Sequence, residues 1–268
     1  MKKVNYLFVA VISTALIFTS CKKKEETPAP VNSGPEQVQN SVSIYFGGTW
    51  CGPCGAYGKP AKESLHNTFG NKSVIISCQV NGGVADPMNN ADANKFATGF
   101  GVNSVPIMYL GGHNDLIQGV GGSTTMSTTI TNTTNTILAK TAVAASSLDV
   151  KVNGSTLTID TKTKFFENQT EEYYVGVYLL ESGLNYTQYQ DASTNKNIHD
   201  NVLRKIVSTA TFGDLLSSNF KSGDIVDKSF TATIDAAWKS ENMSVALILW
   251  RKNTDGKMTI CNGTVKDL

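Results

Sequence analysis

The most constraining feature of this sequence is a pair of cysteines placed where a strand ends and a helix begins. Residues 43–46 predict a short buried strand, residues 47–49 a turn, and residues 56–69 a helix. Cys51 and Cys54 lie between the turn and the helix. The N-terminus of a helix carries unpaired N–H groups and a partial positive charge, which favour a thiolate over a thiol. This placement therefore predicts a reactive cysteine.

The two cysteines are expected to divide the steps of thiol–disulfide exchange between them. We expect Cys51 to be exposed at the start of the helix, to have a lowered pKa and to attack. Cys54, one turn further on, is expected to be shielded and to resolve the mixed disulfide. Pro53 suits the first helical turn because its missing N–H has no partner there. Trp50 is expected to provide an apolar platform beside the attacking sulfur.

A zinc site and a purely structural disulfide fit the cysteine pair less well. A zinc site needs four ligands, and neither a second CxxC nor a pair of histidines lies at a matching spacing. A structural disulfide suits an oxidising compartment, but closing a two-residue loop gains little stability. Neither a zinc site nor a structural disulfide accounts for the adjacent tryptophan or for the strand–turn–helix context. We therefore expect redox chemistry at this pair, with no metal.

Residues 50–54, Trp-Cys-Gly-Pro-Cys, resemble the active-site motif of thioredoxins, and the resemblance extends over residues 41–141. Pro60 resembles the helix-kinking proline of that family, displaced by one residue. Residues 101–110 resemble the segment that leads to the family's cis-proline, which lies against the redox pair. The resemblance implies that Val105 presents its backbone to the substrate and that Pro106 is this proline. The other elements expected of the fold are strands at 74–80 and 116–120 and helices at 92–100 and 124–140.

The sequence departs from the thioredoxin pattern at two places. Thioredoxins bury an aspartate beneath the disulfide as a proton acceptor, and the matching residue here is Tyr45, which cannot serve as a base near neutral pH. The stretch between the cysteines and Pro106 is also longer, with residues 82–90 as the expected insertion. The fold and the redox competence are expected to survive both changes, but fast reduction in the manner of cytosolic thioredoxin is not expected.

The first forty residues predict export and anchoring. Residues 1–20 have a positive start and an apolar run, which fits a signal peptide. Small residues then precede Cys21; this resembles a bacterial lipobox and implies lipidation, while the alternative is an ordinary signal that leaves a thiol. Residues 21–40 are polar and contain prolines, which predicts a flexible linker. We expect an outer-membrane lipoprotein, facing the periplasm or the cell surface and held by its acyl chains.

The pattern changes after the predicted thioredoxin-like domain at 41–142. Alternating apolar residues on both sides of Asn153-Gly154 predict a hairpin, and short strands separated by polar turns predict an all-β sandwich domain over residues 143–268. Residues 179–184, Tyr189-Gln190 and residues 199–204 resemble the C-terminal domain of the twenty-eight-kilodalton outer-membrane-protein family. Those lipoproteins have a thioredoxin-like domain followed by an immunoglobulin-like one, so the resemblance implies an immunoglobulin-like sandwich here. Further strands are expected at 173–180, 230–234, 245–250 and 258–265.

The remaining candidate residues favour structural roles. His199 near Arg204 is interpreted as a structural histidine in a loop, and the scattered histidines cannot supply a metal site. Cys78 and Cys261 are expected to be buried, unreactive thiols. A disulfide between them stays open, because sequence alone cannot fix connectivity.

Two functions are compatible with these features. The first is a thiol–disulfide oxidoreductase acting on exported proteins that bear thiols or disulfides. No flavin or nicotinamide motif is present, so we expect no cofactor, and the electrons would come from a redox partner protein. The second is a surface lipoprotein for binding or adhesion, in which the thioredoxin fold is a scaffold. The net charge of +1 gives no reason to expect nucleic acid as a partner.

Overall fold

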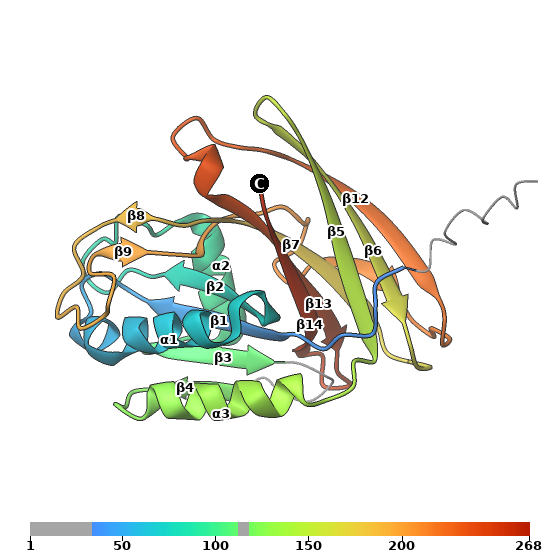
Figure 1. The fold of residues 1–268 in the computed structure, drawn as a ribbon, viewed down its shortest axis with the longest axis horizontal. Helices are drawn as coiled ribbons and strands as arrows, with labels where there is room; N and C mark the ends of the chain where they lie inside the picture. Colours follow the sequence, from blue (N-terminus) through green and yellow to red (C-terminus); the bar gives the residue numbers. More distant parts are fainter. Residues whose placement is uncertain (1–33, 112–117) are drawn as a thin grey trace, which may run out of the picture. The chain divides into compact units, whose positions relative to one another are not determined.

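The computed structural model describes residues 34–111 and 118–268 (Figure 1). The predicted signal peptide at 1–20, Cys21 and the linker up to residue 33 lie outside the described residues. Residues 34–268 form one compact unit. Within the described ranges, no helix combines the length and the apolar character needed to cross a membrane.

The thioredoxin-like part is built around four strands. The central strand β1 (Ser41–Gly47) runs parallel to β2 (Ser73–Gln79) and antiparallel to β3 (Ile107–Gly111), which pairs in turn with β4 (Gln118–Gly121). Every residue of β1 and β2 is buried. Continuous burial is expected for strands covered on both faces of a sheet, which explains why their sequences read as unbroken apolar or small-residue runs.

Helices cover the two faces of this sheet. A short π-helix (Cys54–Gly58) leads into α1 (Lys59–Phe69), and the change to α-helical bonding falls beside Pro60, which has no N–H to donate. The helices α1 and α3 (Met126–Leu138) pack together on one face through a shared apolar core. On the other face lies α2 (Ala91–Phe100), which Asn90 caps through its side chain. The expected helices at 92–100 and 124–140 thus match α2 and α3 to within two residues.

The second half of the chain continues the same sheet. The order is β14-β13-β7-β10-β2-β1-β3-β4, and β11 pairs with β7 outside this path. Only Val202 and Ser77 are paired where β10 meets β2. The predicted boundary near residue 142 falls between α3 and β5, but the large sheet runs across both halves, which the sequence pattern did not predict. The new strands are β7 (Tyr173–Glu181), β10 (Val202–Ile206), β11 (Asp214–Ser217), β13 (Met243–Lys252) and β14 (Met258–Asp267).

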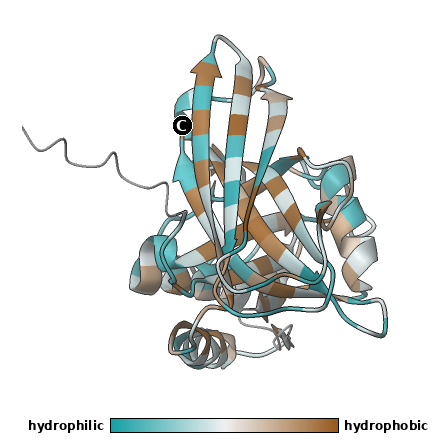
Figure 2. Cartoon of the chain, turned by 90° about the vertical axis from the view of Figure 1, so that its right-hand side faces the viewer, coloured by the Kyte–Doolittle hydropathy of each residue, from teal (hydrophilic) through white to brown (hydrophobic). Residues whose placement is uncertain are grey.

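A second, three-stranded sheet packs against this extension. It contains β5 (Ala144–Asn153), β6 (Thr156–Phe165) and β12 (Ile225–Thr233), with the order β12-β6-β5. Residues along β6 alternate between buried and partly exposed, and Figure 2 shows the matching alternation of hydropathy. On the buried side of this sheet, Leu157 and Ile159 pack against apolar residues of β7 and β13. The two sheets therefore face each other as in a sandwich. The β5–β6 turn has Gly154 at φ 59°, as the hairpin signal predicted.

One loop of the second half crosses to the cysteine pair. The strands β8 (Leu184–Asn185) and β9 (Ile198–His199) form a small ladder whose connection runs beside the start of the π-helix (Figure 1). We call residues 184–199 the strap. Two 3-10 turns, Gly70–Lys72 and Ser240–Asn242, complete the described elements.

The last residues before β1 also contact the second half. The Gln39 amide donates to the carbonyl of Cys261, and Asn40 donates to the side-chain oxygen of Asn262 and to the carbonyl of Gly263. The end of the segment expected to be a linker therefore runs along β14.

Candidate redox site

The cysteine pair forms a disulfide at the start of the helical segment. The N–H of Cys54 points at Sγ of Cys51, with an N···S distance of 3.1 Å, and Gly55 donates to the Cys51 carbonyl. Pro53 stands at the position before the first helical residue. An N–H directed at the sulfur of Cys51 would stabilise a thiolate there once the disulfide is reduced.

Cys51 is less accessible than the sequence indicated. Its exposed fraction is 4%, and Cys54 is fully buried. The expectation of an exposed Cys51 was therefore wrong. The strap lies against the neighbouring residues: a Cβ added to Gly52 would lie 2.5 Å from Oε1 of Gln190, and one added to Gly55 would lie 2.0 Å from the carbonyl oxygen of Tyr189. The strap therefore covers a side of the cysteine segment that the Trp-Cys-Gly-Pro-Cys motif alone gave no reason to expect covered.

The proline segment lies on another side of the disulfide. The Val105–Pro106 peptide bond is cis, as the resemblance to thioredoxins implied. The carbonyl oxygen of Val105 is 3.7 Å from Sγ of Cys51. Pro106 packs against Gly58, where an added Cβ would come within 2.7 Å of the proline ring. The structure thus brings Cys51, Cys54, Val105 and Pro106 together.

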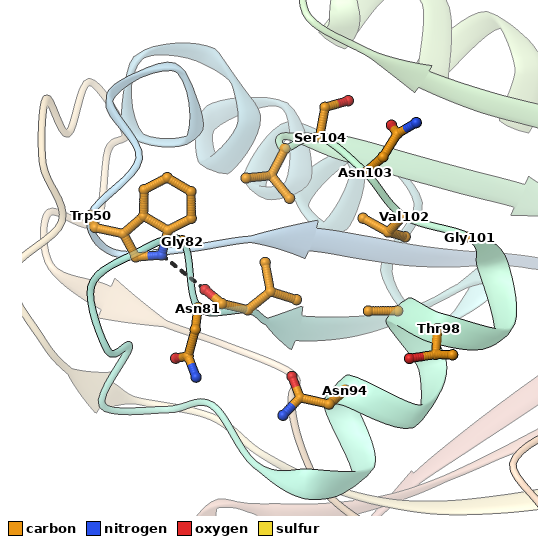
Figure 3. A pocket seen from close by; sticks show the side chains of 12 residues that line it. Trp50, Asn81, Gly82, Asn94, Thr98, Gly101, Val102, Asn103 and Ser104 are labelled. Carbon is orange, nitrogen blue, oxygen red and sulfur yellow. Dashed lines mark hydrogen bonds between the residues drawn. The ribbon is translucent and has the colours of Figure 1, made fainter.

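A groove of about 930 Å³ extends from this place and is shown in Figure 3. Trp50 forms one end: its indole N–H donates to the Val80 carbonyl at 2.8 Å, and its ring lies against Gly82. None of the described lining residues carries a charge. They are Trp50, Val80, Asn81, Gly82, Asn94, Ala97, Thr98, Gly101, Val102, Asn103, Ser104 and Val105.

Tyr45 lies beneath the site, at the place of the thioredoxin aspartate. Its side chain is buried next to Gly58 and Gly47, and burial raises its pKa further, so the phenol stays protonated. The Lys62 ammonium lies 5.7 Å from the centre of the Tyr45 ring and donates to Oγ of Ser77 and to the carbonyl of Asp200. Burial lowers the pKa of Lys62 to about 8. A phenol and a buried lysine thus stand where thioredoxins keep a carboxylate.

The expected insertion supplies a buried carboxylate to the loop before Cys51. Asp86 accepts hydrogen bonds from the N–H of Thr49 at 2.6 Å and from its hydroxyl at 2.9 Å. It also accepts from the N–H of Met88 and is only 5% exposed. Sequence reasoning marked residues 82–90 as extra chain but gave no role to this residue. An aspartate that precedes a proline, shortly after Gly82-Gly83, is an ordinary turn pattern and carries no signal for such a contact.

Two lysines of α1 anchor the strap to the redox helix. Lys59 is 2% exposed; its ammonium forms ion pairs with Asp191 and Glu63 at 3.3 Å each and contacts the hydroxyl of Ser193. Lys62, already described, donates to the carbonyl of Asp200, the residue that follows the strap. Burial opposes ionisation of Asp191, but the N–H of Asn197, the Ser193 groups and Lys59 together hold its pKa below the usual range.

The other candidate residues have structural surroundings. His199 is buried, its Nε2 lies 3.0 Å from the Tyr186 carbonyl, and burial with the nearby Lys62 lowers its pKa to about 4. Arg204 instead faces Glu181. Cys78 and Cys261 lie in different apolar clusters and do not form a disulfide with each other, and burial raises the pKa of Cys78. Across the described ranges, no three His, Cys, Asp or Glu side chains converge as metal ligands.

Residues 93–263, more than half of the 268-residue chain, match the family of outer membrane protein Omp28. The chain belongs to the Omp28 family. The resemblance that the sequence suggested is thereby confirmed, and the family associates the chain with the outer membrane. The matched segment includes Val105, Pro106 and the strap but begins after the two cysteines. No curated protein matches the sequence.

Two solved structures share the fold of this Omp28 family member. HBP35 of Porphyromonas gingivalis is 14% identical, with a TM-score of 0.65 over 87% of this chain and 76% of that one. Protein AGR_C_4864 from Agrobacterium tumefaciens is 15% identical, with a TM-score of 0.52 over 86% of this chain and 95% of that one. These similarities support the fold alone: a thioredoxin-like mixed sheet with additional antiparallel sheets, carrying the Cys51–Cys54 pair.

Proposed function

We propose that this Omp28 family member is an envelope thiol–disulfide oxidoreductase that exchanges disulfides with exported proteins through Cys51 and Cys54. One observation carries the proposal: the N–H of Cys54 and the carbonyl of Val105 both lie against Sγ of Cys51, at 3.1 and 3.7 Å. The first group stabilises a thiolate. The second belongs to the proline segment that would hold a target chain beside it.

In the reducing direction, two exchange steps transfer the electrons. The Cys51 thiolate attacks one sulfur of a target disulfide, an S–S bond forms to Cys51, and the other target sulfur leaves as a thiolate. The Cys54 thiolate then attacks Sγ of Cys51, which closes the intramolecular disulfide and releases the second target thiolate. The target gains two electrons and the pair loses two. A dithiol protein would return them by the same exchange, and an oxidase role would run these steps in reverse.

Groups around the pair would position the target polypeptide. Trp50, Val105 and Pro106 would contact it directly, with the groove as the path for the residues that flank the target cysteine. We further propose that Cys21 is lipidated and holds the protein on the outer membrane, facing the periplasm or the surface. The second half, in this proposal, is an immunoglobulin-like sandwich that shares its larger sheet with the redox part.

The direct test is capture of a target by the variant Cys54→Ser, which cannot resolve a mixed disulfide. Expressed in its natural envelope, this variant should accumulate adducts with exported proteins that a thiol reductant releases. The matched control is Cys51→Ser, which should capture nothing. Absence of adducts with Cys54→Ser, from a folded protein reactive toward small disulfides, would contradict the proposal.

One observation favours a second function, binding or adhesion with the thioredoxin fold as scaffold. The family match covers the strap and the β-strands of the second half but not the cysteines. Under this alternative, the double variant Cys51→Ser, Cys54→Ser would retain the function of the protein in cells. Under the first proposal it would lose that function entirely.

A further inference from the structure

The side chain of Gln188 lies at a point where several carbonyl oxygens of the redox loop converge. Its Nε2 is 3.1 Å from the carbonyl oxygen of Gly48, 3.2 Å from that of Thr49 and 3.1 Å from that of Cys51. The carbonyl of Tyr189 is also within 3.3 Å. Gln188 is 6% exposed, so these contacts are shielded from water.

Main-chain bonds hold this amide in place from both sides. The N–H of Gln188 donates to the side-chain oxygen of Asn197, across the strap. The N–H of Tyr189 donates to the Thr49 carbonyl at 2.8 Å, and that of Ala192 donates to the Gly55 carbonyl at 3.0 Å. The strap is therefore bonded to the redox segment both before and after the two cysteines, with Gln188 beside the first of them.

The chemistry of this arrangement affects the reactive sulfur. A primary amide has two N–H donors, and here both are directed at carbonyls that otherwise have little access to water. The carbonyls of Gly48, Thr49 and Cys51 each also accept one main-chain N–H, from Cys51, Tyr189 and Gly55 respectively. Removing the amide therefore leaves the second acceptor position of each carbonyl unpaired in a shielded site, which favours rotation of these peptide groups toward solvent. Such a rotation starts at Cys51 itself and would displace the N–H of Cys54 from its 3.1 Å contact with Sγ.

We propose that Gln188 is a positioning residue of the redox site, through which the second half of the chain sets the reactivity of Cys51. The proposal rests on the proposed function in one respect, that Cys51 is the attacking sulfur. Within the part of the chain that the structure describes, the helical N–H of Gly55 is the other donor to the Cys51 carbonyl. No sequence pattern marks this role, because an isolated glutamine 137 residues from Cys51 has no recognisable signature.

The test compares two buried glutamines of the same chain. Gln188→Met keeps the volume and removes the donor; Gln39→Met does the same at a glutamine 7% exposed, whose amide donates to the carbonyls of Asn40 and Cys261. The pH dependence of iodoacetamide alkylation of the reduced full-length protein gives the pKa of the Cys51 thiol. We expect Gln188→Met to raise it by about one unit, the size of a lost helix-terminus interaction, and Gln39→Met to leave it unchanged.

Equilibration with glutathione provides a second measurement on the same variants. A less stable thiolate disfavours the reduced form, so the equilibrium should shift about tenfold toward the disulfide, a potential about 30 mV lower. Gln188→Glu keeps the shape but presents carboxyl oxygens to the same carbonyls, and should raise the pKa of Cys51 at least as much. If Gln188→Met does not fold, the shorter amide of Gln188→Asn should give an intermediate pKa.

An unchanged pKa and potential in a folded Gln188 variant would overturn the proposal, even if the variant were less stable, because lost stability alone indicates a merely structural residue. Neither measurement requires a protein target. Failure of target capture by Cys54→Ser therefore leaves this result interpretable, and the two proposals can fail separately.

Discussion

Replacing Gly58 with alanine should damage both the stability of the protein and the geometry of its redox site. A Cβ at this position would lie 2.7 Å from Cβ of Pro106 and 2.8 Å from the hydroxyl of Tyr45. Both groups are confined, one in the cis-proline segment and the other in the buried layer below it. Insertion of a methyl group into such a site costs about 1–3 kcal/mol. Alanine regains about 1 kcal/mol over glycine in a helix, so we expect a net loss of up to about 2 kcal/mol.

The functional effect should exceed the loss of stability. The inserted methyl group displaces Pro106 and with it the Val105 carbonyl, which is 3.7 Å from Sγ of Cys51. Misplacement of reacting groups by about 1 Å can slow a reaction up to a hundredfold. We therefore expect Gly58→Ala, introduced into the Cys54→Ser protein, to slow target capture at least about tenfold. Stability is measured by urea unfolding and capture by the rate of adduct formation with a disulfide-bonded peptide.

The control for this experiment is Gly70→Ala. Gly70 has φ 53° and no neighbouring atom within 4 Å of an added Cβ, so its substitution introduces backbone strain of about 1–2 kcal/mol without any contact to the redox site. It should lower stability and leave the rate of capture unchanged. A Gly58→Ala protein that captures the peptide at the normal rate would refute the argument that contact between the end of the π-helix and Pro106 positions the site.

Three further predictions concern the buried charges around the pair. Because the pKa of Lys62 is lowered to about 8 in the folded state, the unfolded chain binds more protons between about pH 8 and its ordinary pKa of about 10.4. Stability should therefore rise with pH through this window, and Lys62→Met should remove the rise in urea unfolding, while Ser77 keeps its bond to the Asp200 carbonyl. The lowered pKa of Asp191 stabilises the folded state above the carboxyl's unfolded pKa, about 3.9, and this contribution is lost as pH falls through its folded value. The protection of residues 186–197 against hydrogen exchange should therefore fall below about pH 4, and in Asp191→Asn it should be lower already at neutral pH. Asp86→Ala leaves the Thr49 N–H unpaired and should cost about 1–3 kcal/mol in urea unfolding, whereas Asp86→Asn, which keeps an acceptor, should cost less.

The elements around the cysteines were predictable because their signals are local. The buried strand, the glycine turn and the Cys-Gly-Pro-Cys segment lie within about a dozen residues, and each has a preference that agrees with the fold. The cis peptide before Pro106 followed from a resemblance confined to the residues around it. The hairpin at Asn153-Gly154 is a local signal of the same kind.

The burial of Lys59 and Lys62 could not be predicted in this way. Lysine at successive turns of a helix normally indicates a solvent-facing side, since a buried ammonium needs a partner. Here the partners, Asp191 and the Asp200 carbonyl, come from more than 130 residues further along the chain. No periodicity in either segment indicates that these residues come into contact. The strap is equally far in sequence from Cys51, which is why the sequence led us to expect an exposed Cys51.

The extended sheet escaped prediction for a related reason. Within the large sheet, the two halves are joined through a single register pair, Val202 with Ser77, and one pair has no sequence signature. The strand β2 was recognisable by its apolar run, but the short strand β10 was not among the expected strands. An apolar run also predicts burial without indicating which strand lies beside it. The longer strands were therefore predictable, whereas β10 and the strand order were not.

The sharing of one site between distant segments has a consequence for how this protein can vary. The first segment supplies the two sulfurs, the Pro106 segment supplies a carbonyl beside them, and the strap supplies a side-chain donor to the Cys51 carbonyl. The last two lie inside the Omp28 family match and the sulfurs do not. A chain that kept the strap but lost the cysteines would still fold the strap onto this segment and would lack redox activity, since the Gln188 side chain bonds only to main-chain carbonyls there. Side chains at positions 51 and 54 can therefore change without loss of these bonds, which makes the redox pair separable from the fold that holds it.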